Sequence, residues 1–245
     1  MKKKLSNFKS IPSGFQKFSP KQQAEIEEFG MILELINNTL LMKSALEEKV
    51  EKSLQLMKEG LDIPMAGVLR FFLNDLPDGP INQIEQMVEK VEHFAYLFPA
   101  GTSLEMMNAF SSRVGFPDSH QSFPSKIVSK ELGSLCGKEE VPTEIFKAWG
   151  KNAKAETVGI EIFIPNIEAS LAYKWIAEGI CRHIALKVKS LESISQIHQI
   201  LSENNPKESS LKNTTPLKNL SESSATLYCD KNVSDYIVRL EFFYK

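Results

Sequence analysis

The chain has 245 residues, of which 42% are hydrophobic, and its formal net charge is −2. This composition predicts a globular protein with a sizeable core and gives no electrostatic reason to expect nucleic acid or an acidic membrane surface as a partner. Three cysteines without a CxxC spacing indicate reduced thiols rather than a disulfide framework. The charged start MKKKLSNFKS lacks the apolar segment of a signal peptide, and no apolar run is long enough to span a membrane, so we expect a cytoplasmic protein.

The first 80 residues are expected to be helical. Ser19-Pro20 is a typical helix start, and apolar residues then recur at helical spacing until Gly60 ends the pattern. Asn37-Asn38 is a candidate break that would divide this stretch into two helices. A shorter helix is predicted at residues 65–73, and a Pro/Gly-rich cluster at residues 76–80 then marks a boundary. The sequence therefore predicts a helical N-terminal region, 1–80, and a second region, 81–245.

The second region mixes strands with helices. β-Branched and aromatic residues predict strands at HFAYLF (93–98), VGIEIFIP (158–165), HIALKV (183–188), ATLYC (225–229) and YIVRLEFFY (236–244). Helices are predicted at residues 104–114, 166–179 and 191–201, and a further helix is expected around residues 144–149. The polar stretch 202–223 is expected to be a flexible loop.

The same order of elements occurs twice. Each copy has a strand that opens with His, a turn, an amphipathic helix, a less regular middle and a last strand with a Glu among apolar residues. The first copy runs from His93 to Glu161, and the second runs from His183 to Glu241. This self-similarity predicts two equivalent modules, at about residues 81–166 and 167–245.

The two His and two Glu residues of these copies are candidate metal ligands. A carboxylate among apolar residues is costly to bury unless it meets a proton, a cation or a metal. If two small βαβββ sheets meet to form a cup, the four equivalent side chains converge on one point. His and Glu suit Ni²⁺, Zn²⁺, Fe²⁺, Mn²⁺ or Co²⁺. The alternative is that each His is a hydrogen-bonded core residue and each Glu faces solvent.

Four stretches of the second region carry a resemblance to a known superfamily: VEHFAYLFPAGTSLEMMNAF, VGIEIFIPN, CRHIALKVKSLESISQIHQIL and IVRLEFFYK. They resemble the vicinal oxygen chelate superfamily, which includes glyoxalase I, extradiol dioxygenases and methylmalonyl-CoA epimerases. The resemblance covers roughly residues 81–245. It implies an α+β fold in which duplicated βαβββ modules form a cupped sheet, here preceded by the helical N-terminal region. Many members pair modules between chains, so the resemblance leaves a homodimer open.

Bacterial glyoxalase I enzymes are similar in taking His, Glu, His and Glu from the four equivalent strands. That likeness implies a divalent metal held by His93, Glu161, His183 and Glu241, with Glu161 or Glu241 as the catalytic group that moves a proton. It implies isomerase or lyase chemistry on a small-molecule substrate with two neighbouring oxygens. The dioxygenase branch instead implies Fe²⁺ held by His93, His183 and Glu241. A non-catalytic binding protein on the same fold is a third alternative.

The chain departs from glyoxalase I in three respects. It has a helical N-terminal region, its first module is longer, and it shows no residue set that can be assigned to glutathione. Three further reactive side chains are expected to play no part in the site. His120 lies in a loop, His198 lies on a predicted helix, and no motif orients a base toward Cys136.

Overall fold

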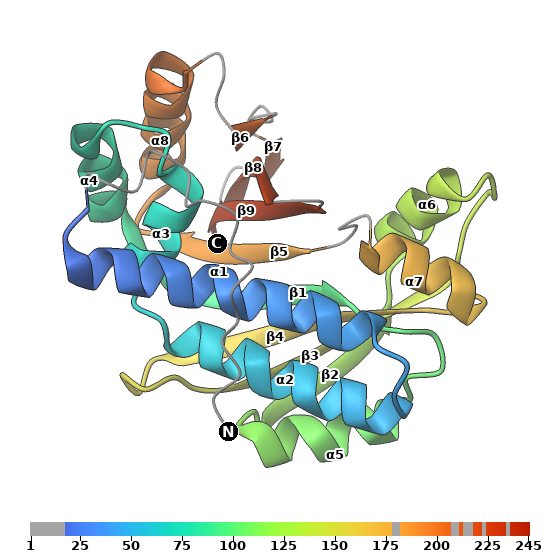
Figure 1. Cartoon of the computed structure of the whole chain (residues 1–245). Helices are drawn as coiled ribbons and strands as arrows, with labels where there is room; N and C mark the ends of the chain where they lie inside the picture. The colour runs from blue at the N-terminus through green and yellow to red at the C-terminus, as the bar shows by residue number, and fades with distance from the viewer. Residues whose placement is uncertain (1–17, 178–181, 207–210, 213–217, 222–223, 234–235) are drawn as a thin grey trace.

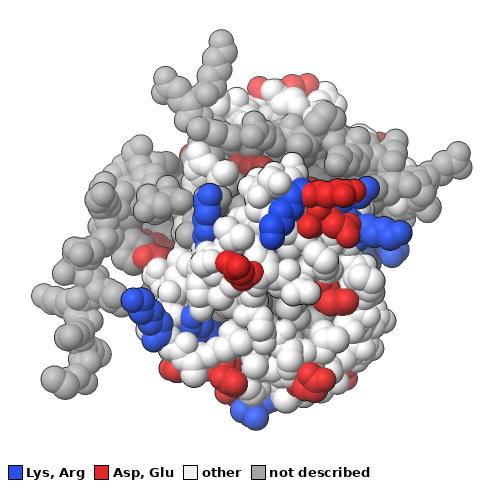
Figure 2. All heavy atoms as spheres, turned by 90° about the vertical axis from the view of Figure 1, so that its right-hand side faces the viewer, with Lys and Arg blue, Asp and Glu red and all other residues white. Residues whose placement is uncertain are grey.

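The computed structural model describes residues 18–177, 182–206, 211–212, 218–221, 224–233 and 236–245. The charged N-terminal start, Cys181 and much of the predicted loop at 202–223 lie outside these ranges. Within them, no helix is both long enough and apolar enough to cross a membrane. Basic and acidic side chains of the described residues are interspersed on the face shown in Figure 2, in keeping with the near-neutral net charge.

The N-terminal region is helical, as predicted. Helix α1 (Pro20–Leu41) begins at a capping box in which Ser19 and Gln22 bond each other's backbone N–H groups. Asn37-Asn38 does not break α1, which runs through both residues, and the buried side-chain amide of Asn37 accepts a hydrogen bond of 2.7 Å from the guanidinium of Arg182. The break comes a few residues later, and three further helices follow: α2 (Leu46–Asp62), α3 (Met65–Leu73) and α4 (Asp78–Met87).

The rest of the chain builds one mixed sheet (Figure 1). Its strands are β1 (Val88–Leu97), β2 (Asp118–Pro124), β3 (Thr143–Lys151), β4 (Thr157–Pro165), β5 (His183–Val188), β6 (Leu211–Lys212), β7 (Lys218–Ser221), β8 (Ser224–Val233) and β9 (Tyr236–Tyr244). Their order is β2-β3-β4-β1-β5-β9-β8-β6, and β7 pairs with β8. The helices of this region are α5 (Leu104–Val114), α6 (Lys126–Leu135), α7 (Ala169–Ala177) and α8 (Leu191–Asn204).

The sheet is made of two equivalent halves, which confirms the predicted fold class. In the first half, β1 leads through α5 to β2, β3 and β4, and β1 pairs parallel with β4. In the second half, β5 leads through α8 to the short β6 and β7 and then to β8 and β9, and β5 pairs parallel with β9. The halves join where β1 pairs antiparallel with β5. The chain is therefore α+β, with a helical N-terminal region followed in the sequence by two βαβββ modules.

Three predictions about elements are wrong. The stretch that holds His120, expected to be a loop, is strand β2. The expected loop at 202–223 contains the end of α8 and the short strands β6 and β7. The helix expected around residues 144–149 is part of strand β3, which pairs with β4 along its whole length and also with β2. Helical and strand patterns are hard to separate in a segment this short, and here pairing with two neighbours decides the outcome. As a strand, β3 places Lys147 directly opposite Glu161.

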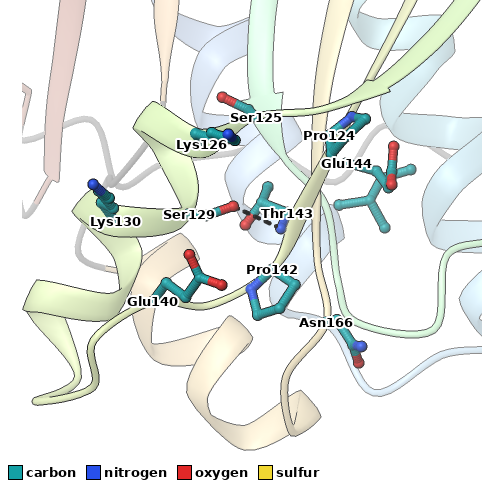
Figure 3. Close-up of a pocket in the computed structure, with 11 residues that line it drawn as sticks. Pro124, Ser125, Lys126, Ser129, Lys130, Glu140, Pro142, Thr143, Glu144 and Asn166 are labelled. Carbon is teal, nitrogen blue, oxygen red and sulfur yellow. Dashed lines mark hydrogen bonds between the residues drawn. The ribbon is translucent and has the colours of Figure 1, made fainter.

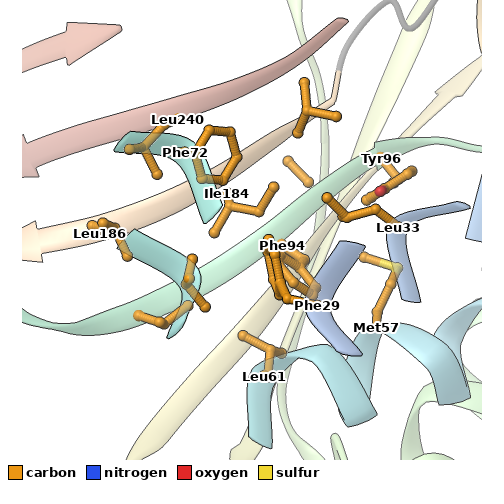
Figure 4. Packing of buried hydrophobic residues seen from close by; sticks show 14 of the residues in the cluster. Phe29, Leu33, Met57, Leu61, Phe72, Phe94, Tyr96, Ile184, Leu186 and Leu240 are labelled. Carbon is orange, nitrogen blue, oxygen red and sulfur yellow. The ribbon is translucent and has the colours of Figure 1, made fainter. Parts of the chain in front are cut away.

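The two faces of the sheet have different roles. Phe94 and Tyr96 of β1 point to the helical side, where they join a single hydrophobic core with α1, α2 and α3 (Figure 4). The ring of Phe94 lies 5.9 Å from that of Phe29 and packs against Gly60, at which an added Cβ would lie 2.3 Å from it. Because successive side chains alternate, His93 and Ala95 point to the opposite face, which we call the histidine face.

Candidate metal centre

The pairing of β1 with β5 brings the two predicted histidines together. The strands are antiparallel, and His93 lies opposite Ala185 while His183 lies opposite Ala95. Each small alanine leaves room on the histidine face for the imidazole of the other module. As a result, the two Nε2 atoms lie 3.2 Å apart and the ring planes stand at 77° to each other.

The last strand of each module adds the predicted glutamate. Because β4 is parallel to β1 and β9 is parallel to β5, Glu161 and Glu241 come to equivalent positions beside the two alanines. The Oε2 atom of Glu241 is 3.2 Å from Nε2 of His183, and the Oε2 atom of Glu161 is 3.8 Å from Nε2 of His93. The structure therefore gathers all four predicted residues in one place.

Three of these side chains form a set that fits a divalent metal. One ligand atom from each of His93, His183 and Glu241 lies within 4.8 Å of the other two. Two imidazole nitrogens and a carboxylate oxygen are sound ligands for iron, zinc, manganese, cobalt or nickel. The side chains are only 13–16% exposed, so they are shielded but still open to a ligand.

Glu92 fixes the orientation of one imidazole. Its Oε2 atom lies 3.0 Å from Nδ1 of His93, so that nitrogen donates a proton to the carboxylate and Nε2 keeps its lone pair toward His183. Burial raises the pKa of Glu92, but the hydrogen bond from His93 and the neighbouring charges, which include Lys90 and Lys147, outweigh it and leave that pKa below its ordinary value. Neighbouring residues in a strand usually face opposite ways, and a register irregularity between Val91 and His93 allows this contact.

Burial shifts the pKa values of His183 and Glu241, the histidine and glutamate of the second module. It lowers the pKa of His183 well below its ordinary value, with help from the nearby His93, and it raises the pKa of Glu241. Phe163 lies 6.1 Å from the His183 ring, and Phe243 lies 6.3 Å from the His93 ring. A neutral imidazole beside a poorly solvated carboxyl group is a site where a bound cation relieves the cost of burial.

Glu161 has a partner that sequence analysis missed. Its Oε2 atom lies 2.5 Å from Nζ of Lys147, the residue opposite it in the β3–β4 pair. In the second module, the residue opposite Glu241 is Tyr228. The two modules therefore differ at this point, although their histidines and glutamates match. The contact of Lys147 with Glu161 could not be predicted because the segment of Lys147 was expected to be helical. Glu92 could have been found from its position next to His93 in the sequence.

The other reactive side chains lie elsewhere, as expected. His120 donates from Nε2 to the carbonyl oxygen of Phe116 at 2.8 Å, and His198 lies on α8. Cys136 lies at the end of α6, where its thiol donates to the carbonyl of Gly133 at 3.4 Å. None of these residues is in the group around His93.

A cavity of about 500 Å³ lies between α6 and the ends of β3 and β4 (Figure 3). Its lining includes Ser125, Lys126, Glu140 and Glu144, and it contains none of the four predicted ligands. Ser129, which also lines it, is already bonded to the backbone N–H of Thr143 at 3.0 Å. The cavity is therefore separate from the candidate metal centre.

No family model matches the chain, and no curated protein matches it in sequence. Among solved structures, it is similar to a variant of Streptomyces coelicolor methylmalonyl-CoA epimerase bound to 2-nitronate-propionyl-CoA, with 14% identity, a TM-score of 0.33, and coverage of 63% of this chain and 97% of that one.

A second similar structure is methylmalonyl-CoA epimerase with methylmalonyl-CoA and NH₄⁺, with 13% identity, a TM-score of 0.33, and coverage of 64% of this chain and 94% of that one. At such identities and TM-scores, the likeness is no evidence of a shared substrate or reaction.

Proposed function

We propose that the protein is a metal-dependent enzyme that moves a proton on a small substrate with two neighbouring oxygens, which is isomerase or lyase chemistry. The observation that carries this proposal is the convergence of His93, His183 and Glu241, whose ligand atoms lie within 4.8 Å of one another on a shielded sheet face. Two imidazoles and a carboxylate held this close by strand register are costly unless a cation joins them.

A divalent metal at this point would act as a Lewis acid toward the substrate oxygens. The chain's own residues would do the rest. Glu92 keeps Nε2 of His93 directed at the site, and the rings of Phe163 and Phe243 lie beside the two imidazoles. Glu161, next to the three ligands, would hold the proton that moves between substrate atoms.

An Fe²⁺-dependent dioxygenase is the second candidate. It is favoured by the same three residues, because two histidines and one carboxylate are the ligand set of many non-haem Fe²⁺ oxygenases. In that case the carbon-bound proton would stay in place and the reaction would consume oxygen.

The reaction class can be tested on metal-loaded protein in ²H₂O. A panel of 2-hydroxy and 2-oxo carbonyl compounds would be incubated with the protein, and NMR would detect deuterium incorporated at carbon. In a second assay, Fe²⁺-loaded protein would be mixed with catechols and the uptake of oxygen would be recorded. We expect deuterium incorporation that falls at least about 100-fold in Glu161→Gln while the metal stays bound. Oxygen uptake without deuterium incorporation would support the dioxygenase. If the protein shows neither activity, the remaining alternative is a non-catalytic binding protein on this fold.

A further inference from the structure

We propose that Lys147 holds Glu161 away from the metal, so that the chain supplies three protein ligands rather than the four that the resemblance to glyoxalase I implies. Lys147 is then a positioning residue that sets the number of positions open to substrate. This inference rests on the proposed metal centre and deepens it.

Strand register builds the contact between Lys147 and Glu161. The two residues are direct partners in the antiparallel β3–β4 pair, so their side chains leave the same face side by side. Nζ of Lys147 lies 2.5 Å from Oε2 of Glu161, whose distance to Nε2 of His93 is 3.8 Å. The ammonium group also lies 5.8 Å from the centre of the Phe123 ring on β2. Lys147 is thus held from two strands.

The second module shows what the same position does without a lysine. Tyr228 lies opposite Glu241, and Arg239, two residues before Glu241 on β9, is bound to Asp230 by contacts of 2.7 and 3.1 Å. Glu241 is therefore turned to His183, at 3.2 Å. One glutamate meets an ammonium group and the other meets an imidazole, although the strands that carry them are equivalent.

Charge and burial keep this difference in place when a metal binds. The side chain of Glu161 is 13% exposed and that of Lys147 is 28% exposed. If Glu161 turned to the metal, it would leave a largely shielded ammonium group beside a dication and without its partner. His93, His183 and Glu241 face no such competition, so an octahedral ion would keep about three positions for water or substrate.

Metal titration of two glutamate variants tests the ligand number. Mn²⁺ would be titrated into metal-free wild type, Glu161→Gln and Glu241→Gln, with binding followed by calorimetry. The proposal predicts that Glu161→Gln keeps a dissociation constant within about threefold of wild type, whereas Glu241→Gln raises it at least about 100-fold. Equal losses in the two variants would show that Glu161 is a ligand and would overturn the proposal.

Removing the lysine should release Glu161. In Lys147→Met, the carboxylate becomes free to bind Mn²⁺, so affinity should rise about tenfold with the added charged ligand. The water-proton relaxivity of bound Mn²⁺ should fall by about a third, because about two inner-sphere waters remain instead of about three. Lys147→Arg should restore wild-type values, since a guanidinium group also binds a carboxylate.

Controls separate this effect from general damage. Lys151→Met makes the same change on the same strand, where the lysine bonds Thr157 rather than a carboxylate, and it should behave as wild type. The double variant Lys147→Met, Glu161→Gln should lose the gain in affinity. Unchanged relaxivity in Lys147→Met would overturn the inference alone. A wild type that binds no Mn²⁺ would overturn the proposed function as well.

Discussion

His93 and His183 lie on adjacent antiparallel strands with their Nε2 atoms 3.2 Å apart, and each faces an alanine of the other module. The repeated His-x-Ala pattern therefore has a structural reason. Because β1 and β5 pair antiparallel, each histidine lies opposite the residue that follows the other histidine by two positions. A small residue there lets both imidazoles reach the same point.

Enlarging either alanine should close the site. Ala95 and Ala185 are fully buried on the histidine face, so Ala95→Leu or Ala185→Leu would put a branched side chain where the ion belongs. We expect at least about tenfold weaker Mn²⁺ binding and a loss of about 1–3 kcal/mol in the free energy of unfolding. Ala148→Leu is a matched control, because Ala148 is equally buried but points to the helical side. It should lose stability and keep its affinity, and normal affinity in Ala95→Leu would contradict the account.

Glu92→Gln should weaken metal binding without removing a ligand. The change takes away the carboxylate that accepts the Nδ1 proton of His93, and outer partners of this kind contribute about 10–100-fold to affinity. Calorimetric titration would measure the change in dissociation constant. Glu89→Gln provides the control, because Glu89 lies on the same strand and pairs with Lys187 instead. Equal affinities for the two variants would show that the contact of Glu92 has no role in binding.

The helical region should be part of the folding unit of the sheet. In Gly60→Ala, the added Cβ would lie 2.3 Å from the ring of Phe94, the neighbour of His93, so α2 or β1 must shift. We expect a loss of about 1–3 kcal/mol and a lower Tm. Gly79→Ala is the control, since nothing lies within 4 Å of its added Cβ and it should keep or slightly gain stability in α4. A Gly60→Ala variant as stable as wild type would mean that α2 does not pack closely on β1.

Lys231 should make the free energy of unfolding depend on pH in the alkaline range. Its Nζ donates to the carbonyl of Phe72 at 3.1 Å and to Oδ1 of Asn74 at 2.5 Å, and burial lowers its pKa from 10.5 to about 8. Between these values the unfolded chain binds more protons than the folded one, so the free energy of unfolding should rise with pH. The contribution should reach about 3 kcal/mol at most. Urea unfolding of wild type and Lys231→Met, at about pH 7 and about pH 10, would measure it. The difference between the two proteins should grow in favour of wild type, and a constant difference would contradict the assignment.

The sequence predicted most of the elements, because their patterns are local. β-Branched and aromatic residues predicted β4, β5 and β9, and the repeated order of elements predicted the two modules; the structure confirms these predictions. The predicted bounds of β9 are those observed. The four candidate ligands were found because they recur at equivalent positions, and the structure brings them together.

The remainder depended on contacts that no local pattern encodes. Strand β3 was expected to be helical, since its strand state is decided by pairing with β2 and β4. Lys147 could not be linked to Glu161 without that register. Glu92 reaches His93 only through an irregularity in the pairing of β1 with β5. The boundary predicted near residue 80 stays a prediction, and the buried residues of the helices and the sheet form one core.

The most direct test of the account is a calorimetric titration of Mn²⁺ into metal-free protein, with wild type, His93→Ala, His183→Ala and His198→Ala measured side by side. The metal centre predicts one ion per chain in wild type and in His198→Ala, whose histidine lies away on α8, and no measurable binding in the other two. A wild type that binds no ion, or binding that survives in both His93→Ala and His183→Ala, would contradict it.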